Sequence, residues 1–188
     1  MPWLIVISGY LLGSIPTGYI AGRFFGKVDI RRVGDGNMGA QNAFRQLGAK
    51  IGVAVGIIDA GKGALAILIA QAANLPQITV LLAGVAAVIG HNWPVFLRFR
   101  GGRGEATTIG VLLTTVTQPM LILAIPAIAT LVIWRNVTLA SAVLFVPLPL
   151  VCWWLGMPGA LIAYGVALPC LVGFTHFLRT RQAVTYRI

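Results

Sequence analysis

The chain has 188 residues, of which 58% are hydrophobic and only 10% are charged, and its mean hydropathy is +0.90. A soluble domain usually carries about 25% charged residues, so this composition excludes a water-soluble globular protein and indicates an integral membrane protein. The net charge of +10 could serve nucleic-acid binding, but no basic tract is interleaved with aromatic residues. We therefore attribute the charge to membrane orientation and to an anionic substrate, and we expect no nucleic-acid partner.

Seven apolar segments follow one another along the chain, at about 3–22, 51–73, 77–97, 106–118, 120–134, 138–155 and 159–177. A helix that crosses a bilayer needs about 20 residues, so the fourth and fifth segments are short. These two meet at Gln118-Pro119 and are predicted to form a hairpin; counted as a re-entrant pair, they leave five full spans. We expect an all-α integral membrane protein, a seven-helix bundle that forms one domain over residues 1–188.

The first segment carries Gly9-x-x-x-Gly13 and Gly18-x-x-x-Gly22, a spacing that favours close packing of helices. Cys152 and Cys170 lie in later apolar segments and are expected in the core. Cysteine and histidine residues form no cluster with metal-ligand spacing, so we predict no metal site.

Basic residues occur in alternate connectors, whereas the connectors near Asn74, Pro119 and Gly156 carry none. The C-terminal tail is also basic, with Arg179, Arg181 and Arg187. The positive-inside rule then predicts an N-terminus outside the cell and a cytoplasmic C-terminus, with every basic connector on the cytoplasmic face.

The connector at 31–45 is rich in glycine and asparagine. Its Gly34–Gly39 stretch matches G-x-G-x-x-G but follows a membrane helix instead of a buried strand, and Gly56–Gly63 resembles a P-loop without the Ser or Thr after its lysine. We therefore predict no nucleotide cofactor. Glycine-rich turns beside helix N-termini do bind anions, so we expect a binding role for one set of residues: Gly36, Asn37, Gly39, Asn42 and Arg45. Arg31 and Arg32 are expected to anchor the connector to lipid headgroups.

Asp59 and Lys62 are three residues apart in the second segment, so their side chains share one face of a helix. Charges inside a membrane helix are costly and usually face a functional interior. The two residues either neutralise each other as a structural pair or help to position a site.

The run Arg98–Gly110 stands between two long apolar segments and holds three arginines and three closely spaced glycines within 98–104. Arginine matches phosphate geometry, and glycine lets a ligand approach the backbone N–H groups, so the run predicts a phosphate-binding loop. His91, shortly before it, could be a general base or could cap its helix. A third polar cluster, Arg135–Ser141, is expected to join His176 and Arg179 on the same face.

Four motifs in this order, Gly34–Arg45, Asp59-x-x-Lys62-Gly63, Gly90–Thr107 and Leu139–Ser141, resemble the bacterial acyl-phosphate:glycerol-3-phosphate acyltransferase (PlsY) family. The resemblance covers nearly the whole chain. It implies a seven-helix enzyme of the inner membrane whose active site faces the cytoplasm. Such an enzyme transfers a fatty acyl group from acyl phosphate to the 1-hydroxyl of glycerol 3-phosphate. The products are lysophosphatidic acid and phosphate, in phospholipid biosynthesis, and no cofactor is used.

By this resemblance, the catalytic residues are Arg45, Arg103, Ser141 and His176. The residues implied to bind substrate are Asp35, Gly36, Asn37, Gly39, Ala40, Gln41, Asn42, Asp59, Lys62, His91, Arg100, Gly101, Gly102, Gly104 and Thr107. The chain departs from the family pattern at four positions, where the family usually has Ser, Lys, Val and Asn: Asp35, Arg103, Glu105 and Arg179. An acid beside two phosphates is expected to pair with Arg45 or Arg103. The departures leave two alternatives open, a paralogue that acylates another polyol phosphate and a non-catalytic membrane protein that binds anionic lipid.

Overall fold

The computed structural model describes the backbone of residues 1–185 and the side chains of residues 1–179, so Arg181 and Arg187 of the basic tail lie outside the described side chains. The described chain is helical and contains no strand. Its elements, in order, are α1 (Pro2–Ser14), α2 (Thr17–Phe25), the 3-10 helix η1 (Ile30–Arg32), α3 (Ala40–Leu47), α4 (Ala49–Ala72), α5 (Gln77–Asn92), the 3-10 helix η2 (Val95–Leu97), α6 (Glu105–Thr115), α7 (Thr117–Trp134), α8 (Val137–Phe145), α9 (Leu148–Trp154) and α10 (Gly159–Thr185).

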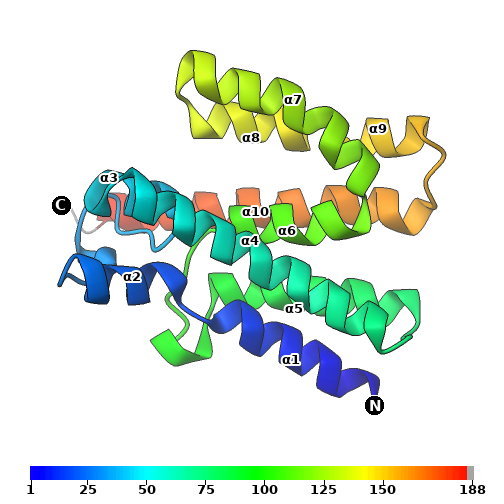
Figure 1. Cartoon of the computed structure of the whole chain (residues 1–188), viewed down its shortest axis with the longest axis horizontal. Helices are drawn as coiled ribbons and strands as arrows, with labels where there is room; N and C mark the ends of the chain where they lie inside the picture. The colour runs from blue at the N-terminus through cyan, green and yellow to red at the C-terminus, as the bar shows by residue number, and fades with distance from the viewer. Residues whose placement is uncertain (186–188) are drawn as a thin grey trace. The chain divides into compact units, whose positions relative to one another are not determined.

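The chain divides into two compact units, one formed by Met1–Val111 with the segment from Val172 onward, the other by Leu112–Leu171. In the first unit α1 packs along α5, α4 contacts both, and α3 packs on α4 (Figure 1). Gly9 and Gly13 face the backbone of α5, where a side chain on either glycine would collide with a carbonyl group. The close packing predicted from this glycine pair is therefore confirmed. Gly18 packs instead against Met38 in a loop.

The first apolar segment is not the single helix that we expected over 3–22. It breaks between α1 and α2 at Ile15-Pro16, where Ile15 has an extended ψ of 116°. Proline disfavours helical geometry in the residue before it, so the ladder of helix hydrogen bonds ends there. The Ile15 carbonyl accepts from the Thr17 N–H at 3.0 Å and is left pointing out of the regular helix.

The connector predicted at 31–45 contains a helix of its own, α3, preceded by an ordered loop. The loop is held by apolar side chains, because Ile30 and Met38 are almost completely buried against Ala43 of α3 and Val55 of α4. This small core fixes the glycine-rich turn in place, and the turn therefore has a defined shape.

In the second unit α7 packs on α8 and on α9, and Pro147 separates the latter two helices. The α6 helix, with 11 residues, is short as predicted, but α7 has 18 residues and begins at Thr117, before the expected junction at Gln118-Pro119. Six helical segments of the described chain are long and apolar enough to cross a membrane, and α6 is not one of them. The count of seven thus stays a prediction. Cys152 is buried as expected, whereas Cys170 is exposed.

Candidate functional site

The glycine-rich loop, residues 98–104 between η2 and α6, packs on the C-terminal end of α5. The Gly101 N–H donates to the Asn92 carbonyl at 3.2 Å, and the Gly102 N–H donates to the His91 carbonyl at 3.0 Å. A side chain on Gly102 would collide with the His91 ring, so only glycine allows this approach. These N–H groups satisfy the last carbonyls of a helix. The N–H groups of Gly101 and Gly102 are thus used within the chain, and contact of either glycine with substrate stays a prediction.

Gly104 turns the chain from this loop into α6. Its φ of +82° lies in the left-handed region, and a side chain there would collide with the Asn92 side chain. Glu105 is the first residue of α6, where an acidic side chain interacts favourably with the positive end of the helix dipole. The departure from the family pattern at this position thus has a local structural reason.

Arg103 is the residue of the glycine-rich loop that reaches toward other segments. Its carbonyl accepts from the Thr175 hydroxyl of α10 at 3.0 Å, and its Nη2 lies 3.5 Å from Oδ2 of Asp35. Its Nε is buried and has no hydrogen-bond partner among the described residues. The charges of Arg103 and Asp35 also act on the exposed His176 imidazole. Asp35 therefore pairs with Arg103 and not with Arg45, and a contact of His176 with either residue stays a prediction.

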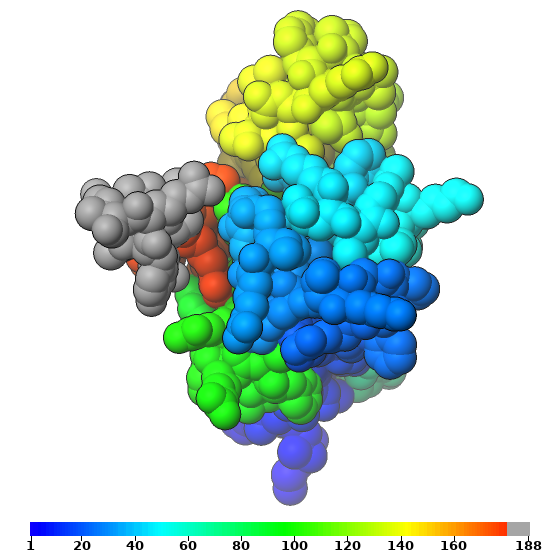
Figure 2. Space-filling view, turned by 90° about the vertical axis from the view of Figure 1, so that its left-hand side faces the viewer, coloured from blue at the N-terminus to red at the C-terminus, as the bar shows by residue number. Residues whose placement is uncertain are grey.

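The 26–40 segment that carries Asp35 lies beside the glycine-rich loop on the face drawn in Figure 2, where the first is blue and the second green. Asn42 gives this segment its shape. Its buried side-chain amide donates to the carbonyls of Ile30, Val33 and Asn37 at 2.8 to 3.1 Å and accepts from the Asp35 N–H at 3.3 Å. The Asn42 side chain is thus used in organising the loop, and a contact with substrate remains untested.

The turn between Asp35 and α3 leaves polar backbone near the surface. The Asn37 N–H donates to Oδ1 of Asp35 at 3.0 Å, and Gly36 has a φ of +72°, which favours glycine. No side chain caps α3 at Gly39. The first N–H groups of a helix carry partial positive charge, so the start of α3 at Ala40 and Gln41 suits an anion.

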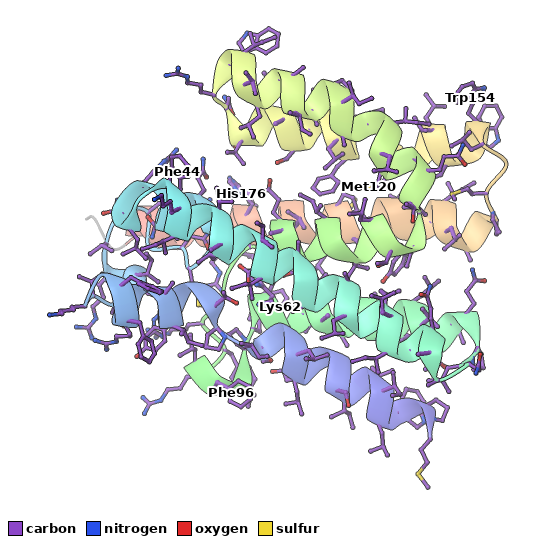
Figure 3. All side chains as sticks on the ribbon, in the orientation of Figure 1. Phe44, Lys62, Phe96, Met120, Trp154 and His176 are labelled. Carbon is purple, nitrogen blue, oxygen red and sulfur yellow. The ribbon has the colours of Figure 1, made fainter. Side chains whose placement is uncertain are left out.

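A buried charged cluster lies beneath the glycine-rich loop. Oδ1 of Asp59 is 2.9 Å from Nζ of Lys62 and 3.6 Å from Nδ1 of His91. Lys62 also donates to the Ile15 carbonyl at 3.0 Å, the group freed by the break between α1 and α2 (Figure 3). The expectation that Asp59 and Lys62 share one helix face is confirmed, and a role of either residue in binding substrate stays a prediction. The side chains of Asp59, Lys62 and His91 are at most 5% exposed. The glycine-rich loop covers this cluster at His91, whose ring packs against Gly102.

Asn92 and Thr175, which the sequence did not single out, take part in the hydrogen bonds that connect α10 to the glycine-rich loop. The Arg179 guanidinium donates to the Asn92 carbonyl at 2.8 Å, the same carbonyl that accepts from Gly101, and Thr175 donates to Arg103. Asn92 lies next to His91 in the Gly90–Thr107 motif and Thr175 precedes His176, so each is adjacent to a residue that the sequence did single out. That adjacency was the only signal available.

The remaining predicted residues are less closely gathered. Arg45 and Arg100 are exposed, and Arg45 makes no ion pair within residues 1–179. Thr107 is completely buried beside Gly63 of α4. Ser141 donates to the Val137 carbonyl at 2.8 Å within α8, in the second unit, so its predicted meeting with His176 stays a prediction.

A second ion pair marks the surface of the same loop region. Asp29 and Arg31 are joined by two side-chain hydrogen bonds of 2.8 and 2.9 Å, and the guanidinium stacks over Tyr19. The hydrogen bond from Arg31 lowers the pKa of Asp29 to about 2. The pair lies outside the predicted site and gives a close comparison for Asp35 and Arg103.

Comparison with known proteins identifies relatives over almost the full length. The family described as glycerol-3-phosphate acyltransferase matches residues 3–185. The chain is 52% identical over 182 residues to glycerol-3-phosphate acyltransferase 4 of Dehalococcoides mccartyi, covering 97% of this chain and 98% of that protein. It is 43% identical to a glycerol-3-phosphate acyltransferase of Geotalea daltonii, covering 92% and 89%.

A solved structure is similar as well. The glycerol 3-phosphate form of PlsY (YgiH), an integral membrane glycerol 3-phosphate acyltransferase, matches with a TM-score of 0.86 and 33% identity, covering 99% of this chain and 93% of that one. Its lysophosphatidic acid form matches with a TM-score of 0.83.

Proposed function

Because the chain belongs to the glycerol-3-phosphate acyltransferase family, we propose that it esterifies glycerol 3-phosphate with a fatty acyl group taken from acyl phosphate. Membership of this family makes the chain an enzyme of phospholipid biosynthesis and replaces the alternative of a non-catalytic lipid-binding protein. The acyl-phosphate donor, the 1-hydroxyl as acceptor and the products lysophosphatidic acid and inorganic phosphate belong to our proposal.

The observation that carries this proposal is the state of Arg103. Its side chain is 19% exposed, its Nε has no hydrogen-bond partner within the described chain, and its charge acts on His176. A planar arginine with unused donors at a partly exposed surface matches the oxygens of a phosphate group. The start of α3, which has no side-chain cap, supplies further N–H groups. It follows the loop whose Asp35 contacts Arg103.

The proposed chemistry is direct transfer. The acceptor hydroxyl oxygen forms an ester bond with the acyl carbonyl carbon, the bond from that carbon to the phosphate oxygen breaks, and the departing phosphate carries away the hydroxyl proton. An acyl phosphate is already activated, so positioning and charge stabilisation supply most of the acceleration. We assign that stabilisation to Arg45, Arg103, Ser141 and His176, and we assign substrate positioning to the loops at 35–42 and 100–107.

We further propose that the chain spans the bacterial inner membrane several times with its active site facing the cytoplasm and its N-terminus outside. The basic connectors support this orientation through the positive-inside rule. Large apolar side chains are exposed along the candidate spans, among them Ile57 of α4 and Ile125 of α7. Such surfaces suit contact with membrane lipid.

The test is an assay of the purified full chain with palmitoyl phosphate and labelled glycerol 3-phosphate, with palmitoyl coenzyme A as the comparison donor. We expect labelled lysophosphatidate from the acyl phosphate alone and a loss of at least about 100-fold in R103A, the scale found when one donor to a transition-state charge is removed. Arg32→Ala is the matched control, since Arg32 is an exposed arginine of η1 outside the site, and it should retain activity. Product from coenzyme A only, or full activity in R103A, would contradict the proposal.

A further inference from the structure

Asp35 places a negative charge inside a region built to receive anions. We propose that its carboxylate is an internal competitor of the substrate's phosphate group, occupying the Arg103 guanidinium until phosphate displaces it. This inference rests on the function proposed above and gives Asp35 a role different from direct binding of substrate.

The position of the carboxylate is fixed by its own loop. Oδ1 accepts from the Asn37 N–H at 3.0 Å, and this leaves Oδ2 directed at Nη2 of Arg103, 3.5 Å away. The Asp35 side chain is 29% exposed and that of Arg103 is 19% exposed, so water and a small anion can reach both. An incoming phosphate therefore finds the arginine already facing a carboxylate.

The contact between the two side chains is loose enough to be displaced. Charge-assisted hydrogen bonds measure about 2.7–2.9 Å, as in the pair of Asp29 and Arg31 at 2.8 and 2.9 Å, whereas the contact of Asp35 with Arg103 is 3.5 Å. It also leaves Nε of Arg103 without a partner. A phosphate has three or more oxygens and can approach the partly exposed guanidinium to the distance of a charge-assisted hydrogen bond, which the distant carboxylate oxygen does not do.

The positive charges around Arg103 explain why a carboxylate beside it is useful before phosphate binds. The positive charges of Arg100 and Arg103 both act on Arg179, so three arginines share this region. Without a bound anion these like charges repel one another, and Asp35 offsets part of that repulsion. Once a phosphate takes over this task, the carboxylate becomes a like charge beside it and weakens its binding.

Removing the charge of Asp35 should therefore strengthen phosphate binding. An exposed ion pair contributes up to about 1 kcal/mol, which corresponds to a factor of about five in a dissociation constant. Asp35→Asn keeps an oxygen that accepts from the Asn37 N–H and removes only the charge. We expect its dissociation constant for phosphate to be about two- to fivefold lower than that of the wild type.

The experiment measures binding of inorganic phosphate to the purified full chain by isothermal titration, for the wild type, D35N and D29N. Asp29→Asn makes the same change in net charge at a nearby loop position but leaves Arg103 untouched, so its dissociation constant should equal that of the wild type. Asp35→Ser provides a second variant if the asparagine disturbs the loop. The KM values for glycerol 3-phosphate and for acyl phosphate are measured separately, and the one that falls identifies the phosphate that Arg103 receives.

Tighter phosphate binding in D35N and D35S, with D29N unchanged, supports the inference. Equal or weaker binding in both Asp35 variants overturns it, and so does an equal gain in D29N, which would show a general charge effect. A wild type that binds phosphate in competition with Asp35 but forms no lysophosphatidate would instead refute the proposed function. The binding and activity measurements thus distinguish the two failures.

Discussion

Replacing Lys62 with methionine should destabilise the protein strongly, because it would leave the Asp59 carboxylate buried without its cation. The Asp59 side chain is 1% exposed, and its Oδ1 lies 2.9 Å from Nζ of Lys62. The next nearest partner, Nδ1 of His91, is 3.6 Å away and too distant for a good hydrogen bond. Breaking a buried ion pair by removing one partner costs about 3–5 kcal/mol. The Ile15 carbonyl keeps its bond from Thr17 and adds little to this cost.

For a chain of this size, such a loss corresponds to a fall in Tm of about 10 °C, since 1 kcal/mol shifts Tm by roughly 2–4 °C. Thermal unfolding in detergent, followed by the fluorescence of the five tryptophans, measures it. Lys50→Met is the matched control, because Lys50 is an exposed residue of the same helix, and its Tm should change little. The double variant Asp59→Leu with Lys62→Met should recover most of the loss, because an apolar pair removes both charges. If K62M melted with the wild type, or the double variant melted with K62M, the buried pair would not carry the energy assigned to it.

Three further results are expected. Gly110→Ala should lower Tm, because its new methyl group would meet the backbone of α4, whereas Gly61→Ala, with open space around it in the middle of α4, should leave Tm unchanged or slightly higher; an equal fall in both would refute the close packing. Arg179→Leu should lower kcat at unchanged expression, because it removes one of the two hydrogen bonds to the Asn92 carbonyl and loosens the glycine-rich loop; an unaltered pH–rate profile would mark Arg179 as a positioning residue. Asp29 should stabilise the fold by at most about 2 kcal/mol above pH 4, because its pKa is lowered to about 2. The Tm difference between wild type and D29N should then shrink as the pH falls from 5 to 2, and a difference that grew would contradict the sign.

The positions of the long helices could be predicted because a bilayer demands about 20 consecutive apolar residues, and such runs are visible without any knowledge of packing. The helix breaks at Pro16 and Pro147 could not be seen in this way, because one proline barely changes the mean hydropathy of about 20 residues. The α3 helix was missed for a different reason. It is eight residues long and polar on one side, and its stability depends on packing against α4.

In the candidate site, contacts between residues close in sequence could be predicted, and contacts between distant residues could not. Asp59 and Lys62 could be paired from the sequence because a separation of three residues places them on one helix face. Asp35 could be assigned an arginine partner but not the right one of two, because Arg103 is far along the chain and only the folded loops bring the two side chains together. The hydrogen bond from Lys62 to the Ile15 carbonyl forms because the helix breaks at Ile15. The spacing of the charged residues does not predict that break.

The docking of the glycine-rich loop changes what its glycines do. Because the N–H groups of Gly101 and Gly102 are bonded to the end of α5, they cannot form the anion-binding backbone that a run of glycines suggests. Their missing side chains instead let the loop lie directly on His91, whose Nδ1 is 3.6 Å from the buried Asp59 carboxylate. In our proposal, recognition of phosphate depends on the Arg103 side chain and on the start of α3. Arginine offers a planar fork where lysine offers a single point charge, so the substitution of the family's lysine at this position changes how an anion is held and not only how strongly.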